Sequence, residues 1–368
     1  MGRSAVVIGA GITGAAAVWQ LGQLGYAVRV FEREQVVGGH VRTEWMHGIP
    51  YEPHGAHIFH TTDEPVWRLV TKLADFVPYR HRVVIRVRGQ LIPWPIQRSA
   101  VSQLPDGAQL VYELNRRPTS VDTTNFETYC VSLLGRTLYD ECVGPYTVKQ
   151  WGRDPHTLSA SVAKGRVELR DDGYLDFFRD PFQGWPRAGY GMLVEAMLQE
   201  AEVNLGTTVT ADHMSDVAAR GEPVIVTSAL DDFFAEPGAL PWRGVRLEST
   251  LLRGVTLAQP AMVVNEPALA VPWTRTIETK WALDDLHDIS GTVVMREFPG
   301  ADAKHYPVLD AAGTNLATQA SLERRLTAFR RNPIIPAGRL AGYGYINMDV
   351  AIRRGLNAAT QIATEAHR

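Results

Sequence analysis

Three histidines occur at intervals of three residues in the segment "YEPHGAHIFHTTD", at His54, His57 and His60. Imidazole nitrogens bind zinc and exchange protons near neutral pH, so the spacing suggests a metal site or a proton-handling cluster. Pro53 and Gly55 disfavour a helix here, and a strand would turn His57 away from the other two. No carboxylate partner is evident nearby. We therefore expect no metal at this segment, and side chains that line another kind of site.

A glycine-rich turn near the N-terminus has the spacing of a dinucleotide-binding site. The sequence predicts a buried strand at Ala5–Ile8, a turn with Gly9, Gly11 and Gly14, a helix to about Leu24 and a second strand ending at Glu32. In such a turn the glycines permit a tight bend, a close approach of pyrophosphate and close helix packing. The helix N-terminus would face the phosphates with its positive end, and Glu32 would accept hydrogen bonds from a ribose.

The residues after Glu32 indicate which dinucleotide is bound. In "EREQVVGGHVRTE", Gly38, Gly39 and Arg42 follow the acid, and this pattern resembles the second glycine motif of FAD proteins of the amine oxidase and sugar mutase type. The resemblance favours FAD over NAD.

Composition excludes several functional classes. The 368 residues carry a formal net charge of −3 with no block of like charge, which gives no footprint for nucleic acid. No apolar run approaches the roughly 18 residues that span a membrane, and we expect no membrane partner. Two cysteines, Cys130 and Cys142, match no metal-binding spacing and are compatible with a reducing cytoplasm.

Hydrophobic periodicity places other elements around this nucleotide-binding unit. The segments 81–96, 261–281 and 291–298 alternate as antiparallel strands do, and the stretch from about Ser102 to Ala163 is helical. Within that stretch Asn125 is a candidate N-cap, and a buried face is expected from Phe126, Val131, Leu134 and Leu138. We expect an α/β fold in three parts: a discontinuous FAD-binding Rossmann-like domain (1–78, 187–232 and 330–368), an antiparallel β-sheet domain (79–98, 166–186 and 233–329) and a helical domain (99–165).

Several segments, in the same order along the chain, resemble the bacterial UDP-galactopyranose mutase family. They are "GAHIFHT" (55–61), "NFE…GR…YTVKQWGRDP" (125–155), "WPRAGYGMLVEAML" (185–198), "PWTRTIE" (272–278), "VVMREFPG" (293–300), "HYPV" (305–308) and "GRLAGYGYINMD" (338–349). The resemblance implies a mutase that interconverts pyranose and furanose forms of a nucleotide-linked hexose without net redox change. The active cofactor would be reduced FAD, whose N5 forms a sugar adduct, with NAD(P)H or another external reductant needed to reduce it.

The resemblance also implies roles for individual residues. It assigns the diphosphate to Arg166, Arg296, Tyr306 and Tyr345, because arginine offers a permanent charge with planar donors. It places Tyr146 and Trp151 beside the nucleoside and sugar, and Arg339, Asn347 and Met348 near the flavin. His57 and His60 would lie against the flavin ring, with His60 close to N5, and Tyr51–His54 would be connecting structure.

Departures from the family pattern concern substrate recognition. One inserted residue leaves Arg170 as an alternative to Arg166, and Phe177 stands where a phosphate-contacting tyrosine is expected, so Tyr174 is a candidate replacement. Cys142 replaces a phenylalanine near the base, which would enlarge the base pocket. A GDP-linked sugar such as GDP-fucose is therefore an alternative to UDP-galactose.

Two other functions remain open at this point. An FAD-dependent oxidase of the amine oxidase type shares the pattern of Glu32, Gly38, Gly39 and Arg42, and would consume oxygen. A non-catalytic flavoprotein would bind ligand without forming product. The family resemblance also implies that a homodimer is possible.

Overall fold

A computed structural model describes residues 3–329 and 331–365. Its first three elements are the predicted nucleotide-binding unit: β1 (Arg3–Ile8), α1 (Ile12–Gln23) and β2 (Tyr26–Phe31). The two strands pair in parallel from Arg3 opposite Tyr26 to Ile8 opposite Phe31. Residues 5–8 of β1 are buried, as a strand covered on both faces requires.

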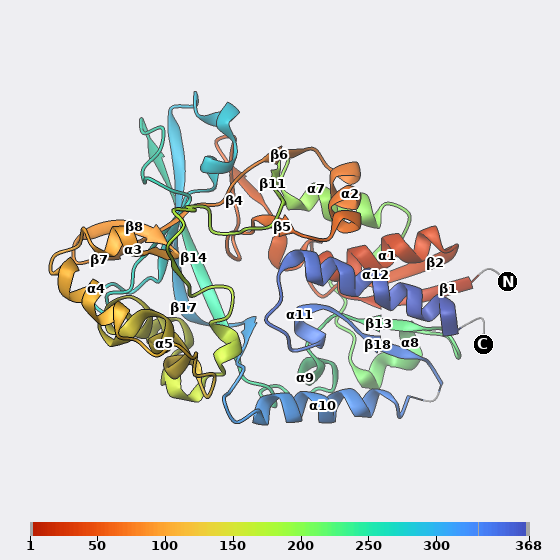
Figure 1. Cartoon of the computed structure of the whole chain (residues 1–368). Helices are drawn as coiled ribbons and strands as arrows, with labels where there is room; N and C mark the ends of the chain where they lie inside the picture. Colours follow the sequence, from red (N-terminus) through yellow and green to blue (C-terminus); the bar gives the residue numbers. More distant parts are fainter. Residues whose placement is uncertain (1–2, 330, 366–368) are drawn as a thin grey trace.

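Distant segments complete this parallel sheet. Its strand order is β12-β2-β1-β13-β18, where β12 is Glu202–Asn204, β13 is Val224–Val226 and β18 is Ile334–Pro336. Numbered within the sheet, this is the 3-2-1-4-5 order of a Rossmann-type fold. The C-terminal helix α12 (Met348–Glu365) lies along α1 (Figure 1). A Cβ on Gly355 of α12 would lie 2.3 Å from the Thr13 carbonyl oxygen of α1, so the contact requires glycine.

A second, six-stranded sheet lies beside the parallel sheet, and its long strands extend away from it (Figure 1). Its order is β14 (Trp242–Arg253), β17 (Gly291–Pro307), β16 (Arg275–Ile277), β15 (Val263–Asn265), β7 (Val83–Val87) and β8 (Gln90–Trp94). The predicted antiparallel pairing holds for each neighbouring pair except β15 and β7, which run parallel. About 175 residues lie between these two strands, including the helical segment and two strands of the parallel sheet, so the chain is long enough for a parallel connection.

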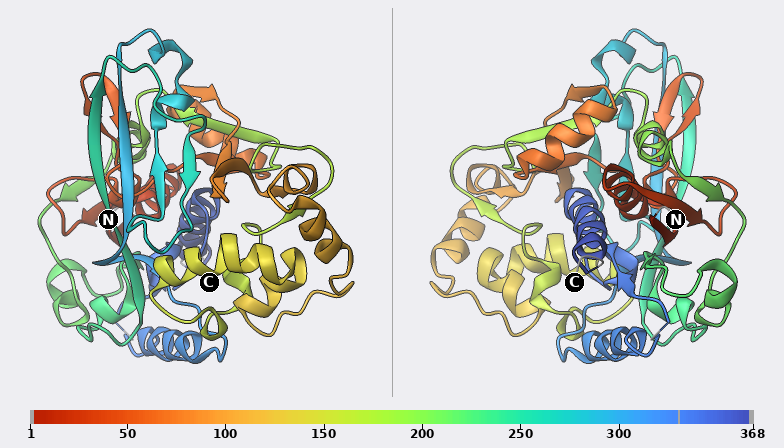
Figure 2. Two further views of the ribbon diagram at one scale, coloured as in Figure 1. Left: turned by 90° about the vertical axis from the view of Figure 1, so that its left-hand side faces the viewer. Right: turned by 90° about the vertical axis from the view of Figure 1, so that its right-hand side faces the viewer.

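The helical lobe consists of α3 (Arg98–Val101), α4 (Gly107–Asn115), α5 (Phe126–Leu138), the π-helical turn η2 (Tyr139–Val143) and α6 (Gly144–Trp151). Asn125 caps α5 as predicted: its side chain accepts the Thr128 amide, and the Thr128 hydroxyl accepts the Asn125 amide. Phe126, Leu134 and Leu138 are buried as expected, whereas Val131 is half-buried. Figure 2 shows this lobe beside the sheets, on the opposite side from the N-terminal strand.

Shorter elements connect these parts. Three small sheets are formed by β5 (Phe59–Thr61), β11 (Phe182–Pro186) and β6 (Phe76–Pro78), by β3 (Glu44–Met46) and β4 (Ile49–Tyr51), and by β9 (Ile96–Gln97) and β10 (Leu169–Arg170). The remaining α-helices are α2 (Glu64–Leu73), α7 (Tyr190–Leu198), α8 (Met214–Val217), α9 (Leu230–Phe233), α10 (Thr314–Leu326) and α11 (Gly338–Ala341). Across the described residues, no helix combines the length and apolarity needed to cross a membrane.

Candidate active site

The predicted glycine turn opens onto a cavity of about 460 Å³, here called the nucleotide cavity. Gly9, Gly11, Glu32, Gly38 and Gly39 line it. Apart from its own chain neighbours, no atom of the described residues lies within 4 Å of the position a Gly11 Cβ would take, so a ligand can approach this backbone closely. Gly14 lies behind the turn, where a Cβ would be 1.9 Å from the Gly9 carbonyl oxygen. The start of α1 has no side-chain cap, which leaves its first N–H groups for an anion.

Glu32 and the second glycine pair line one part of this cavity. The buried Glu32 carboxylate accepts the Ala10 amide at 2.7 Å and the Glu34 amide at 2.9 Å. Gly38 forms a bridge with Gly11, so the two glycine motifs lie side by side. The arrangement fits a dinucleotide: a turn and helix end for the pyrophosphate, and a fixed carboxylate for a ribose.

A second cavity of about 360 Å³, here called the arginine cavity, lies between the six-stranded sheet, the helical lobe and the parallel-sheet lobe. Helix α6 contributes both Tyr146 and Trp151 to the cavity wall. The other predicted residues that line this cavity alone are His60, Cys142, Arg166, Phe177, Tyr306 and Tyr345. Both cavities share His40, His54, His57, His305, Arg339, Asn347 and Met348, so these residues form the junction between them.

Positive charge predominates in the arginine cavity. Arg166, Arg275 and Arg339 line it, and Glu297 is its one carboxylate among the described residues. Glu297, only 1% exposed, accepts Nε and Nη2 of Arg275 at 3.0 and 2.6 Å. Burial lowers the pKa of Arg275, but Glu297, Tyr306 and Tyr146 together outweigh burial and hold the pKa well above its usual value. The Arg275 guanidinium therefore stays charged at the cavity wall, where it can bind an anionic ligand.

Aromatic side chains surround these cations. The Arg166 guanidinium lies 3.8 Å from the centre of the Tyr345 ring, and Arg339 lies 5.8 Å from Tyr306. Tyr306, Tyr345 and Trp151 pack against one another with ring centres 5.4 to 6.2 Å apart. Burial raises the pKa of both Tyr146 and Tyr306, so these hydroxyls stay protonated and can donate hydrogen bonds.

The structure does not bring Arg296 to the cavity, which corrects one expectation. On β17, Glu297 faces inward, and alternation along the strand turns Arg296 outward, where it is exposed and stacks 5.0 Å over Trp273. Arg275, opposite Glu297 on β16, occupies the cavity wall instead.

The alternative phosphate ligand Arg170 is engaged elsewhere. Its buried guanidinium donates to the carbonyl oxygens of Tyr174, Asp176 and Phe177, so it holds the loop 174–177, while Arg166 lines the cavity. Tyr174 is also outside the cavity wall, because its hydroxyl donates to the Phe178 carbonyl at 3.0 Å. Phe177 does line the cavity, so the position expected for a phosphate-contacting tyrosine is apolar in this chain.

The three histidines of the opening segment face different partners. His60, on β5, lies with Nδ1 2.7 Å from an Asp180 carboxylate oxygen, and its ring stacks on Phe178. Burial lowers the pKa of His60, and Asp180 opposes this shift. His57 is fixed through its backbone: its amide donates to Glu52, and its carbonyl accepts Trp185 Nε1 and the Tyr190 hydroxyl.

His54 is more than connecting structure, contrary to the expectation for Tyr51–His54. Its ring lies 5.4 Å from that of His40 and 5.8 Å from that of His305, and all three line both cavities. His40 and His305 stack at 4.4 Å with an interplanar angle of 10°. Burial, followed by repulsion from neighbouring histidines, lowers the pKa of His40 to about 2 and that of His305 to about 4. The imidazoles at the junction are therefore neutral at physiological pH.

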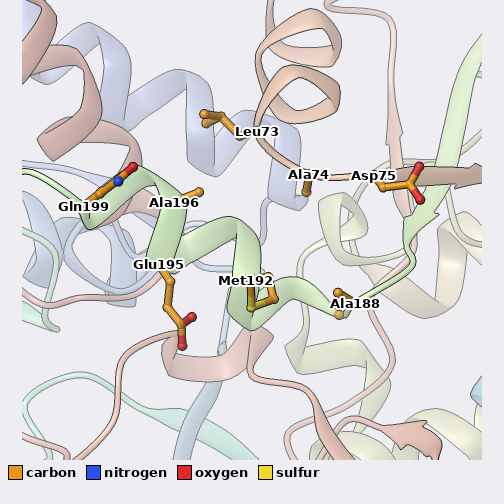
Figure 3. Close-up of a pocket in the computed structure, with 9 residues that line it drawn as sticks. Leu73, Ala74, Asp75, Ala188, Met192, Glu195, Ala196 and Gln199 are labelled. Atoms are coloured by element: carbon orange, nitrogen blue, oxygen red, sulfur yellow. The ribbon is translucent and has the colours of Figure 1, made fainter.

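A third hollow lies on the outer surface between the end of α2 and α7 (Figure 3). None of its lining residues is basic, and Asp75 and Glu195 contribute negative charge. It is therefore unsuited to a phosphate and is separate from the two cavities described above.

Sequence reasoning missed several residues that line the site: Arg275, Glu297, His40, His305, His81 and Phe178. For Glu297 a signal was present, because Val293, Met295 and Glu297 share the buried phase of β17. No pattern in the sequence indicates that His40, His54 and His305 meet, since they come from three separate segments.

A Rossmann-type nucleotide cavity that adjoins an arginine-lined cavity is typical of proteins that bind nucleotides. Comparisons with known proteins identify the family. A model of the NAD(P)-binding Rossmann-like domain matches residues 7–73, and one of UDP-galactopyranose mutase matches residues 141–345, more than half of the chain. The chain therefore belongs to the UDP-galactopyranose mutase family, whose members are isomerases.

Individual relatives are similar to this chain over nearly its full length. A probable UDP-galactopyranose mutase of Klebsiella pneumoniae is 29% identical, covering 98% of this chain and 94% of that protein. A dTDP-fucopyranose mutase of Escherichia coli is 28% identical over 96% of this chain and 97% of its own. A crystal structure of reduced UDP-galactopyranose mutase superposes with a TM-score of 0.80 at 18% identity, covering 100% of this chain and 97% of that one. A putrescine oxidase structure reaches 0.62 at 14% identity, covering 99% of each chain, which reflects the shared fold.

Proposed function

We propose that the protein interconverts the pyranose and furanose forms of a nucleoside-diphosphate hexose, with FAD in the nucleotide cavity. The observation that carries this proposal is the position of Arg166, Arg275 and Arg339 in the arginine cavity, which adjoins the nucleotide cavity. Cleavage of the bond between the anomeric carbon and the diphosphate leaves negative charge on the phosphate oxygens, and guanidinium groups stabilise that charge. Reduced FAD would supply a nucleophilic nitrogen at N5.

The position of each residue would then determine which part of the ligands it contacts. Tyr306 and Tyr345 would donate neutral hydrogen bonds to the diphosphate, and Tyr146 and Trp151 would contact the nucleoside and sugar. Gly9, Gly11 and the start of α1 would hold the FAD pyrophosphate, with Glu32 on the ribose. His57, Asn347, Met348 and Arg339 would contact the flavin from the junction, and His60 would act at its reactive edge.

The identity of the substrate's nucleotide and sugar is also part of this proposal. Cys142 is buried in the arginine-cavity wall, where its small side chain leaves room for a larger base. UDP-galactose, a dTDP-sugar of the kind named for the E. coli relative, and a GDP-sugar such as GDP-fucose are the candidates. We further propose a cytoplasmic enzyme that depends on an external reductant such as NAD(P)H and acts as a homodimer.

The test is to reduce the purified protein and offer it UDP-, dTDP- and GDP-linked pyranoses, following conversion by chromatography. We expect a new furanose peak with at least one donor, formed only after reduction and without stoichiometric use of reductant or oxygen. Oxygen consumption with an amine substrate would support the oxidase alternative. Absence of any product under reducing conditions would overturn the mutase proposal.

A further inference from the structure

His305 lies where the ladder between β14 and β17 is interrupted. Arg243 pairs with Tyr306, but the next residue, Gly244, pairs with Ala301, so the register skips residues 302–305 of β17. Gly244 makes this possible, because a Cβ there would lie 2.2 Å from the Ala301 carbonyl oxygen. The skipped residues form part of the wall of the nucleotide cavity.

The interruption leaves the Val245 amide free to bond the His305 ring, and this bond determines which ring nitrogen carries the proton. The backbone amide of Val245 donates to Nδ1 of His305 at 3.3 Å, and both groups are buried. Because Nδ1 accepts this hydrogen bond, a neutral imidazole must carry its proton on Nε2. Nε2 is itself buried and has no hydrogen-bond partner among the described residues. A buried N–H without an acceptor costs about 1–3 kcal/mol, which suggests that its partner is a ligand.

The position of His305 indicates which ligand that is. His305 is 4% exposed, lines both cavities and has its backbone carbonyl held by Arg339 Nη1 at 3.3 Å. A dinucleotide bound with its pyrophosphate at Gly11 must cross this junction for its ring to reach the arginine cavity. The inference therefore rests on the proposed function, in which that ring is a flavin.

We propose that the Val245 amide holds His305 as its Nε2–H tautomer, and that this N–H donates to the flavin ring at the junction. A donor that faces the ring stabilises the electron-rich reduced form more than the oxidised form, and so raises the reduction potential. His305 acts as a neutral donor and not as a cation. The His40 ring stacks on that of His305. Burial, followed by the nearby His54, His57 and Arg339, disfavours a proton on the His305 ring and lowers its pKa to about 4.

The first measurement is the flavin midpoint potential of the holoenzyme at pH 6.5 and pH 8.5. His305→Phe removes the donor and should weaken the preference for reduced flavin about tenfold, a fall of about 30 mV for a two-electron couple. The fall should be equal at both pH values, because no proton is gained. His305→Gln, which can place an amide N–H near the Nε2 position, should recover most of the potential, and His213→Phe on the exposed turn η5 (Ala211–His213) serves as the control.

Two outcomes would overturn the proposal. One is an unchanged potential in His305→Phe, and the other is a fall confined to pH 6.5, which would indicate an imidazolium. If His305→Phe does not retain FAD, the ¹⁵N spectrum of His305 in the unmodified holoenzyme decides, since a proton on Nδ1 contradicts the tautomer. A purified protein whose absorption spectrum shows no flavin would instead refute the proposed function.

Discussion

At the scale of single residues, Arg275 and Arg296 form a natural comparison. Both come from motifs of the family, and they lie on adjacent strands, yet only Arg275 lines the arginine cavity. We expect Arg275→Lys to raise the dissociation constant for a nucleoside diphosphate about tenfold, because lysine keeps the charge beside Glu297 but loses the planar donor set. Arg296→Lys should leave binding unchanged. Calorimetric titration of UDP, dTDP and GDP into both variants compares them, and equal weakening in the two would contradict the assignment.

Glu52 should give stability a pH dependence that originates in one carboxyl group. It is fully buried, its Oε1 has no hydrogen-bond partner among the described residues, and burial raises the pKa of the Glu52 carboxyl well above its usual value. The folded state therefore retains the proton after the unfolded state has lost it. This contribution to stability is complete below the unfolded pKa of about 4.3 and is lost as the pH rises towards the folded pKa.

Glu52→Gln removes this proton linkage and should become progressively more stable than the unmodified protein as the pH rises from 5 to 8. Urea unfolding at three pH values measures the difference in free energy of unfolding. Glu195→Gln, at an exposed carboxylate on α7, should show no such trend. Parallel pH profiles for Glu52→Gln and the unmodified protein would refute this account.

What the sequence predicts well at this scale are residues inside local motifs. Gly9, Gly11, Glu32 and Asn125 occupy the predicted positions, because each is recognised from a local pattern: a glycine turn, the end of a strand or a helix cap. Which of Arg275 and Arg296 points into the cavity depends on the alternation of side chains along paired strands. The contact between the rings of His40, His54 and His305 depends on how three separate segments pack together. Periodicity within a single segment does not contain that information.

At the scale of elements, α6 is held in place by contacts that its own sequence does not reveal. The Lys149 ammonium donates to four carbonyl oxygens in the turn between β15 and β16, those of Glu266, Ala268, Val271 and Trp273. From β14, Arg243 donates to the carbonyl oxygens of Lys149 and Gln150 at the end of α6. These bonds fix α6, which carries Tyr146 and Trp151, relative to β16, which carries Arg275.

Lys149→Met should therefore separate the two walls of the arginine cavity. We expect a loss of about 2 kcal/mol in the free energy of unfolding, because carbonyl oxygens lose a charged donor, together with a rise in KM for the nucleotide sugar. Urea unfolding and steady-state kinetics measure the two effects. Lys72→Met, at an exposed lysine in the last turn of α2, is the matched control. A loss of stability without any change in KM would show that the Lys149 hydrogen bonds do not position the site.

Element types follow from the sequence more completely than their pairing does. The alternating segments become β7, β8, β15, β16 and β17, since alternation is a local property. The parallel contact of β7 with β15 joins residues about 180 positions apart, and the chain between them passes through the helical lobe and through β12 and β13 of the parallel sheet. The break in register at Gly244, which frees the Val245 amide for His305, likewise depends on both strands together.

At the scale of the whole molecule, neither cavity belongs to one part of the chain. The arginine cavity takes Trp151 from the helical lobe, Arg275 from the six-stranded sheet, and Arg339 and Tyr345 from the C-terminal part of the parallel-sheet lobe. A ligand bound there contacts all three parts and stabilises their arrangement as a unit. Ligand binding should therefore be coupled to the stability of the entire fold.

We expect the holoenzyme to unfold in one calorimetric transition that moves as a whole when nucleoside diphosphate is added. At about one hundred times the dissociation constant, the ligand should add about 2.7 kcal/mol to the free energy of unfolding, because it binds the native state alone. UDP, dTDP and GDP are each tested, and Arg275→Lys at the same concentration should show a smaller shift. Two transitions, of which only one moves with ligand, would mean that the lobes unfold separately and that one of them binds the diphosphate without the others.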